Sequence, residues 1–190
     1  MKVVLASKNP HKLVEISAIL KPLDVEVEET GSTFEENSFL KANAVRKATG
    51  LPALADDSGI AVDALGGAPG VHSARYGDDP ALDDWGRLLL LLKNTEQVPD
   101  GQRQAQFVSV ITLVYPDGRV IQARGEAHGE LLREAHGEGG FGYDPIFYYP
   151  PAGKTFAELT AGEKNQVSHR AKALKLFYEK LCEEGKHADQ

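Results

Sequence analysis

Several residue types are scarce in this sequence of 190 residues, which contains one cysteine, one tryptophan and one methionine. The lone Cys182 excludes an intramolecular disulfide and has no second ligand at metal-binding spacing, so we expect a reducing, cytoplasmic compartment. Hydrophobic runs are short as well: the run from Leu88 to Leu92 is far below the length of a membrane span. The apolar segment from Met1 to Ala6 is too short for a secretory signal. We therefore expect no contact with a membrane.

Clusters of basic residues are also missing. The chain has 21 Lys and Arg against 28 Asp and Glu, a formal net charge of -7, whereas nucleic-acid surfaces gather Lys and Arg against the phosphate backbone. We therefore expect no nucleic-acid partner. A small anionic ligand is still compatible with this charge, because it needs only a locally positive pocket. The hydrophobic content of 42% predicts a packed globular domain.

The stretch from Leu54 to Val62 is the most informative part of the sequence. Two adjacent carboxylates, Asp56 and Asp57, interrupt its apolar run, and they are followed by Ser58 and Gly59, where the backbone can turn sharply. Because side chains of an extended segment alternate in direction, we expect one carboxylate to face a functional site. Carboxylates at a strand end suit a hard cation such as Mg²⁺. A turn with solvated aspartates is the alternative.

The N-terminal segment combines a strand, a polar loop and the start of a helix. Val3 to Leu5 predict a buried strand, and in the loop from Ser7 to Lys12 Asn9 can cap a helix whose first position is Pro10. Backbone N–H groups at the helix start and the two lysines of the loop form a natural site for phosphate. The loop is not a Walker loop, since the glycine-rich run and the Gly-Lys-Ser/Thr ending are missing. An ordinary capped helix is the alternative.

A second helix is predicted from Thr33 to about Thr49, because Thr33 and Glu36 have capping-box spacing. Asn37 and Lys41 lie on one face of this helix, with small residues on the following turns. This face suits a binding site, and a solvated helix face is the alternative.

The remaining elements follow from periodicity and turn residues. The sequence predicts strands at 24–28, 104–115 and 119–127, with a hairpin turn at 116–118; helices at 80–93 and from Ser168 to about Glu184; a polar connector at 96–102; a glycine-rich segment without regular structure at 137–142; and a frayed tail at 185–190. Interleaved strands and helices indicate an α/β protein.

Seven short motifs occur in order along nearly the whole chain. They are Ser7-x-Asn9-x-x-Lys12, Thr33-Phe-x-Glu-Asn37, Ala55-Asp-Asp-Ser-Gly59, Gly66-Gly-Ala-Pro-Gly70, Ser73-Ala-Arg-Tyr76, Gly140-Phe-Gly-Tyr-Asp-Pro145 and Glu163-Lys-Asn-x-x-Ser-His-Arg170. Together they resemble the Ham1 family of inosine/xanthosine triphosphate pyrophosphatases. One such motif is weakly specific, but seven in the family's order are highly specific. His72 and the tail after Cys182 lie outside the family's fixed pattern.

The resemblance implies both an activity and a fold. Enzymes of this family use Mg²⁺ and split a nucleoside triphosphate between its α and β phosphorus atoms, releasing the monophosphate and pyrophosphate. Their role is to remove non-standard purine nucleotides such as ITP, dITP and XTP. The implied fold is an elongated α/β protein with a long mixed sheet and two α/β lobes flanking a central substrate cleft. Residues 1–184 would form this single two-lobed domain, and a homodimer is expected.

The resemblance also implies the site residues. Asp57 is expected to be the catalytic base, and Glu29 and Asp57 the metal ligands. The expected phosphate-binding residues are Ser7, Lys8, Asn9, Pro10, His11, Lys12, Lys41 and Ser58, and the expected base-binding residues are Phe141, Gly142, Tyr143, Asp144, Lys164, His169 and Arg170. An aromatic ring stacks on any purine, so selectivity must come from polar groups. His169 and Arg170 place cations at a helix start, against the helix dipole, and such a conflict is typical of a functional position.

Two other functions are also compatible with the sequence. One is a pyrophosphatase of the Maf type that acts on standard or methylated nucleotides, and the other is a sensor that binds nucleotide without turnover. The acidic set of Glu29, Asp56 and Asp57 favours catalysis, because carboxylates repel a polyanion unless a metal ion lies between them and the phosphates.

Overall fold

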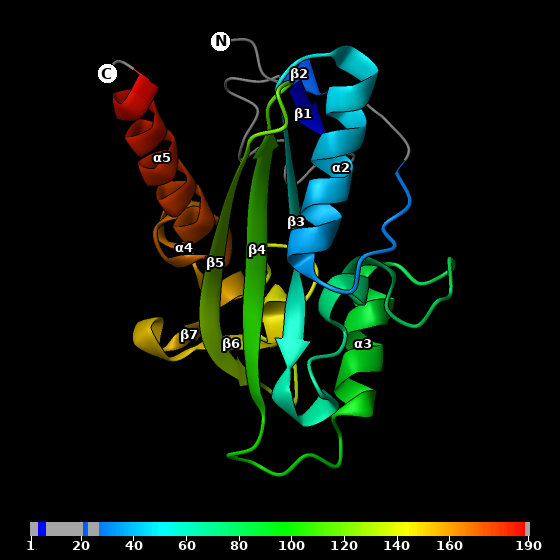
Figure 1. The fold of residues 1–190 in the computed structure, drawn as a ribbon. Coiled ribbons are helices and arrows are strands. Elements are labelled where there is room, and N and C mark those ends of the chain that lie inside the picture. Colours follow the sequence, from blue (N-terminus) through cyan, green and yellow to red (C-terminus); the bar gives the residue numbers. More distant parts are fainter. Residues whose placement is uncertain (1–3, 7–20, 23–26, 189–190) are drawn as a thin grey trace. The chain divides into compact units, whose positions relative to one another are not determined.

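A computed structural model describes the backbone of residues 4–6, 21–22 and 27–188 and the side chains of residues 27–184. Its strands and α-helices (Figure 1) are β1 Val4–Ala6, β2 Lys21–Pro22, α2 Phe34–Thr49, β3 Ala53–Val62, α3 Asp84–Asn94, β4 Gln104–Val114, β5 Val120–Leu131, β6 Phe147–Tyr149, β7 Lys154–Thr155, α4 Ala161–Val167 and α5 His169–Ala188. Short 3₁₀ turns lie at Asp63–Leu65, Gly70–Arg75, Asp144–Ile146, Pro150–Ala152 and Phe156–Glu158.

Most predicted elements are confirmed, with shifted ends. The predicted first strand, second helix and two hairpin strands correspond to β1, α2, β4 and β5. Helix α3 begins at Asp84 and not at Pro80, because Asp83 caps it by accepting a hydrogen bond from Gly86 N–H at 2.7 Å. Helix α5 continues to Ala188, beyond the predicted start of a frayed tail.

Two predicted elements fall largely outside the described residues. The helix after Asn9 lies there completely, as does most of the strand predicted at 24–28. Val27 and Glu28 are described and belong to no strand, so this part of the prediction is wrong.

The strands form one mixed sheet in the order β2-β1-β3-β4-β5-β6-β7. β1 runs parallel to both β2 and β3, whereas the β5–β6 and β6–β7 pairs are antiparallel. The tight turn between β4 and β5 closes where Gly118 N–H donates to the Tyr115 carbonyl at 3.0 Å. The predicted α/β class with a mixed sheet is confirmed.

Contacts within the chain define two compact units. Unit 1 comprises residues 1–57, 109–125 and 172–190, and unit 2 comprises residues 58–108 and 126–171. β3, β4 and β5 each contribute residues to both units.

In unit 1 the sheet lies between α2 and α5 (Figure 1). Ala42 and Val45 of α2 pack against Ala53 and Ala55 of β3. Leu54 lies between these two alanines and points to the other face, because side chains alternate along a strand. There it packs with residues of β4, β5 and α5, namely Ile111, Leu113, Tyr115, Ile121, Ala173, Leu174, Phe177 and Leu181. The small alanines of β3 allow α2 to lie close to the strand.

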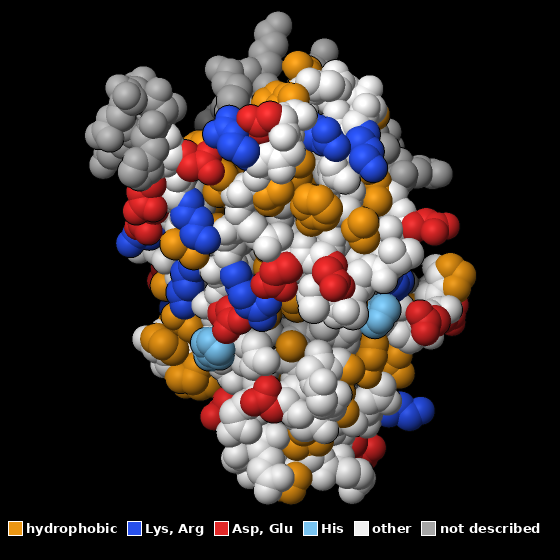
Figure 2. All heavy atoms as spheres, viewed as in Figure 1, with side chains coloured by type: hydrophobic (Ala, Val, Ile, Leu, Met, Phe, Trp, Pro, Cys, Tyr) orange, Lys and Arg blue, Asp and Glu red, His pale blue; other side chains and the backbone are white. Residues whose placement is uncertain are grey.

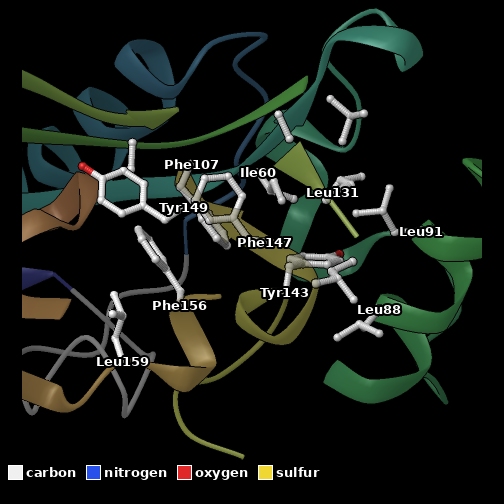
Figure 3. Packing of buried hydrophobic residues seen from close by; sticks show 14 residues of the cluster. Ile60, Leu88, Leu91, Phe107, Leu131, Tyr143, Phe147, Tyr149, Phe156 and Leu159 are labelled. Carbon is white, nitrogen blue, oxygen red and sulfur yellow. The ribbon is translucent and has the colours of Figure 1, made fainter. Parts of the chain in front are cut away.

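Aromatic rings pack against one another within the core of unit 2 (Figure 3). Phe107 meets Phe147 edge to face, with 4.7 Å between ring centroids, and stacks on Phe156 at 5.7 Å. Each such pair contributes about 0.5–1.5 kcal/mol beyond the burial of its area. Phe107 lies on β4 and Phe147 on β6, so this packing fixes the segment that leads into β6.

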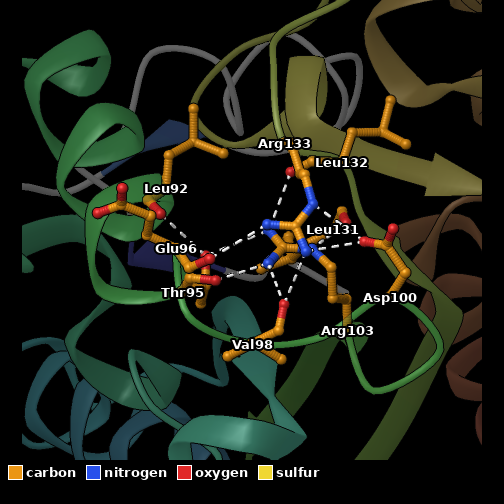
Figure 4. Close-up of polar contacts among 9 residues, drawn as sticks. All are labelled: Leu92, Thr95, Glu96, Val98, Asp100, Arg103, Leu131, Leu132 and Arg133. Atoms are coloured by element: carbon orange, nitrogen blue, oxygen red, sulfur yellow. Dashed lines mark hydrogen bonds and ion pairs between the residues drawn. The ribbon is translucent and has the colours of Figure 1, made fainter.

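Arg103 anchors the connector between α3 and β4 (Figure 4). This side chain is 5% exposed, and its guanidinium donates to the carbonyls of Thr95 at 2.6 Å and Leu131 at 2.9 Å, with a further bond to Leu132 at 3.2 Å. A buried guanidinium needs several acceptors. The connector predicted as simply polar is therefore held to the end of β5.

No helix in the described part of the chain is long and apolar enough to cross a membrane. On the face shown in Figure 2, acidic and basic side chains of the described residues are interspersed.

Candidate functional site

Strand β3 carries both predicted aspartates in its middle. The strand continues from Ala53 to Val62, so the sharp turn predicted after Asp57 is wrong. Gly59 is required there for space, because a Cβ at this position would lie 2.4 Å from the carbonyl oxygen of Gly70. Asp56 and Asp57 are 2% and 5% exposed, which excludes a turn with solvated aspartates.

Lys41 of α2 joins two of the predicted carboxylates. Its Nζ lies 2.7 Å from Asp57 Oδ1 and 3.1 Å from Glu29 Oε1. Burial alone would lower the pKa of Lys41, but the surrounding carboxylates, with Asp57 contributing most, outweigh burial and raise this pKa above its ordinary value of 10.5. Lys41 is therefore a fixed positive charge at neutral pH, and its part of the α2 face is not solvated.

The start of α2 fixes the segment that carries Glu29. Asn37 Oδ1 accepts a hydrogen bond from Gly31 N–H at 2.8 Å. The predicted capping box is present: Thr33 Oγ1 accepts from Glu36 N–H at 3.1 Å, and Glu36 Oε2 accepts from Thr33 N–H at 3.2 Å. A Cβ at Gly31 would lie 2.6 Å from Asn37 Oδ1, so only glycine allows this close approach. The carboxylate of Glu29 is thus presented from a fixed segment.

Glu29 and Asp57 suit a divalent cation. Both present a carboxylate oxygen to the same positive group, the Lys41 ammonium, so they are close enough to share a cation. Among the described residues, no group of three or more His, Cys, Asp or Glu side chains gathers at one point. Mg²⁺ nevertheless keeps several waters and binds through one or two carboxylates. The donor set therefore fits Mg²⁺.

A second polar cluster, in unit 2, contains predicted base-binding residues. Asp144 Oδ2 and Lys164 Nζ are 2.5 Å apart, and their side chains are 3% and 9% exposed. Asp144 Oδ2 also accepts a hydrogen bond from Phe141 N–H at 2.9 Å, and Lys164 Nζ lies 4.5 Å from the centroid of the Phe141 ring. Burial raises the pKa of Asp144 above its ordinary value of 3.8, although Lys164 opposes this change. Asp144 thus holds the backbone of the glycine-rich segment at Phe141, and Lys164 lies over the Phe141 ring.

Arg170, at the start of α5, lies beside the same ring. It is 3% exposed, its guanidinium carbon is 5.7 Å from the Phe141 centroid, and its Nη2 donates to Ser58 Oγ at 3.4 Å. His169 is 5% exposed and stacks on Phe107 with 4.8 Å between centroids. The structure thus brings Phe141, Ser58 and Arg170 together and stacks the imidazole of His169 on an aromatic ring of the core.

Tyr143 is a member of the unit 2 core, and its hydroxyl donates to the Ser73 carbonyl at 2.7 Å. Burial raises the pKa of Tyr143, so the hydroxyl remains a donor. Ser73 Oγ in turn accepts from Ile60 N–H at 2.9 Å. These two bonds tie the segment around Gly142, which has a φ of 59°, to strand β3. The described contacts of Tyr143 therefore hold the backbone of this segment in position.

Two residues that hold segments of the site in place, Asn37 and Ser73, are absent from the predicted site residues. Both belong to motifs recognised in the sequence, and the spacing of Asn37 from Lys41 on one helix face was the available signal. The predicted phosphate-binding loop, Ser7 to Lys12, lies outside the described residues.

Known proteins resemble this chain over nearly its full length. The model of the Ham1 family matches residues 3–180. The chain is 50% identical over 190 residues to the dITP/XTP pyrophosphatase of Thermus thermophilus, covering 94% of this chain and 91% of the relative. It is 48% identical over 193 residues to the dITP/XTP pyrophosphatase of Shigella flexneri, covering 95% and 98%. Among solved structures, the Staphylococcus aureus Ham1 protein matches with a TM-score of 0.88 and 40% identity, covering 97% of this chain and 100% of the other. By both sequence and fold, this chain belongs to the Ham1 family.

Proposed function

We propose that this protein is a Mg²⁺-dependent pyrophosphatase that hydrolyses ITP, dITP and XTP to the monophosphate and pyrophosphate. The observation that carries the proposal is the pair of carboxylates, Glu29 and Asp57, that contact the Lys41 ammonium, in a family member whose relatives are named dITP/XTP pyrophosphatases. Metal-assisted phosphoryl transfer needs anionic metal ligands and fixed cations together. The same activity is expected from the sequence motifs.

In this proposal, the metal ion and the phosphates bind to residues of unit 1. Glu29 and Asp57 hold Mg²⁺, which when bound offsets the negative charge of the phosphates. Asp57 accepts a proton from the attacking water as the water oxygen bonds to phosphorus and the P–O bond between the α and β phosphates breaks. Lys41 and the loop from Ser7 to Lys12 bind phosphate oxygens. Ser58, which belongs to unit 2, contacts the substrate.

The polar cluster around the Phe141 ring binds the purine base, through Phe141, Gly142, Tyr143, Asp144, Lys164, His169 and Arg170. Inosine and xanthosine carry an acceptor oxygen at position 6, whereas adenosine carries an amino donor. The guanidinium of Arg170 offers donors only. A site that donates to the substrate rejects an analogue lacking the acceptor, because buried groups are then left unpaired.

The proposal is tested by measuring pyrophosphate release from ITP, XTP and ATP with and without Mg²⁺. We expect release from ITP and XTP that depends on Mg²⁺ and exceeds release from ATP. Tight binding of ITP without release would favour a sensor. Faster release from standard or methylated nucleotides than from ITP would favour a Maf-type activity.

Further properties complete the proposal. We propose that residues 1–184 act as one functional domain and that the protein works as a homodimer, as the resemblance to the family implies. We place it in the cytoplasm, because its only cysteine, Cys182, is free and exposed. Sedimentation equilibrium over a range of protein concentrations tests the dimer.

A further inference from the structure

Asn37 is a buried residue whose amide nitrogen has no partner in the part of the chain that the structure describes. The side chain is 0% exposed, and its Oδ1 accepts the hydrogen bond from Gly31 N–H. Because a backbone N–H can only donate, this bond fixes which end of the amide is oxygen. The other end, Nδ2, has no hydrogen-bond acceptor within reach among the described residues. Buried donors of this kind are rare in folded proteins, and each one needs an explanation.

The unpaired N–H group belongs to the helix face that carries Lys41. Asn37 precedes Lys41 by one helical turn on α2, so both side chains lie on the same face. Helical side chains lean toward the N-terminus of their helix, which brings the stem of Lys41 back over the turn that holds Asn37. The Lys41 ammonium contacts Glu29 and Asp57, and Gly31, which Asn37 holds, follows Glu29 by two residues.

Charge indicates which acceptor this donor requires. If Glu29 and Asp57 serve as metal ligands, their oxygens are shared with the metal and Lys41 needs another anionic partner. The ammonium of Lys41 and the Nδ2–H group of Asn37 are then two donors on one helix face. Oxygens of a polyphosphate are strong, charged acceptors that match such a pair.

We propose that Asn37 is a phosphate-binding residue: its Nδ2–H group donates to an oxygen of the substrate triphosphate, while its Oδ1 holds the Glu29 segment in place. This inference rests on the proposed function, and it adds a neutral donor to the set of expected phosphate ligands. The Asn37 amide would thus have two roles: its oxygen holds the segment of a metal ligand, and its nitrogen binds the substrate.

Calorimetric titration with inorganic tripolyphosphate, in the presence of EDTA, measures the contribution of the Asn37 Nδ2–H group to anion binding without a metal ion. Asn37→Leu removes donor and acceptor at similar volume, whereas Asn37→Asp keeps an acceptor for Gly31 and loses the donor. Without a metal ion, loosening Glu29 cannot weaken anion binding, because its carboxylate repels the anion. Any loss in Asn37→Leu therefore reports the missing N–H group. We expect both variants to bind tripolyphosphate about tenfold or more weakly than the unmodified protein.

Asn43→Asp is the matched control. Asn43 lies on the same helix, and its Oδ1 accepts from Arg46 at 2.8 Å and 3.1 Å, so the variant adds the same charge beside a cation. At physiological salt such a charge is largely screened, and binding should stay within about twofold. Circular dichroism establishes that each variant is folded. If the added carboxylate of Asn37→Asp prevents folding, the Asn37→Leu variant alone decides the test.

Unchanged tripolyphosphate binding in Asn37→Leu overturns the proposal. It is also overturned if Asn37→Leu weakens only the binding of Mn²⁺ alone, since the amide would then act through Glu29 only. Pyrophosphate release from ITP by the unmodified protein is measured in parallel. If no pyrophosphate is released, the proposed function fails, whereas the tripolyphosphate titration still decides whether Asn37 binds phosphate.

Discussion

Replacing Lys164 with methionine should destabilise the fold strongly, because it removes one partner of a buried ion pair. Lys164 Nζ and Asp144 Oδ2 are 2.5 Å apart, and the two side chains are 9% and 3% exposed. Removing one partner of such a pair costs about 3–5 kcal/mol of unfolding free energy, because the other charge remains buried. We expect the lower end of this range for Lys164→Met, since Asp144 can take up a proton.

The same variant should show a pH dependence of known sign. Burial already raises the pKa of Asp144 above 3.8 while Lys164 opposes the rise, so Lys164→Met should raise this pKa further. The native variant then binds a proton more tightly than the unfolded chain. Its stability must fall as pH rises from the ordinary aspartate value through the raised value. Urea unfolding followed by circular dichroism should therefore show a larger loss at pH 8 than at pH 5.

A double-mutant cycle with Asp144→Asn measures the pair itself. The amide keeps an acceptor for Phe141 N–H, and the double variant should be less destabilised than the sum of the single variants, with coupling on the order of 2 kcal/mol. The exposed pair of Arg119 and Asp117, 2.8 Å apart, provides the control, and Arg119→Met should leave the unfolding midpoint almost unchanged. Single effects of Lys164→Met and Asp144→Asn that add within about 0.5 kcal/mol would refute the reasoning.

Three further predictions concern activity. Asp57→Asn should abolish most turnover and leave the circular dichroism spectrum unchanged, because the amide is a poor metal ligand and no base; near-normal pyrophosphate release would remove Asp57 from this role. Lys41→Ala should weaken the equilibrium binding of ITP much more than that of inosine, since only ITP carries phosphates. Equal weakening of both affinities would contradict a phosphate contact. Arg170→Ala should lower kcat/KM for ITP by about tenfold or more and barely change the activity on ATP, whereas an equal fall for both would make Arg170 structural or phosphate-directed.

Local signals made part of the fold predictable. The capping box of Thr33 and Glu36 and the hairpin turn at 116–118 depend on residues three or four positions apart, so the sequence contains the whole determinant. The segment from residue 144 to 167 was not predictable in the same way. It consists of 3₁₀ turns, strands of two or three residues and one short helix, and none of these is long enough to show a hydrophobic period.

Gly59 shows a second reason why prediction from sequence fails. A glycine after two aspartates and a serine favours a turn, yet β3 continues through it. The residue is glycine because the chain at Gly70 and Ser73 approaches its Cα closely. Such an approach involves residues more than ten positions away, and local sequence cannot distinguish it from a turn. For the same reason, the role of Ser73 became visible only through its contacts.

The start of α5 shows how a broken local rule relates to the candidate site. Arg170 places a cation at the positive end of a helix, which costs about 0.3–1 kcal/mol. Contacts within unit 2 offset this cost: Arg170 lies over Phe141 and donates to Ser58. A neutral side chain at position 170 would relieve the conflict with the dipole, but it would offer fewer donors than the guanidinium, which has five donors and no acceptor. The unfavourable placement is therefore consistent with a requirement for hydrogen-bond donors beside the Phe141 ring, which the base-binding proposal needs and which stability alone does not.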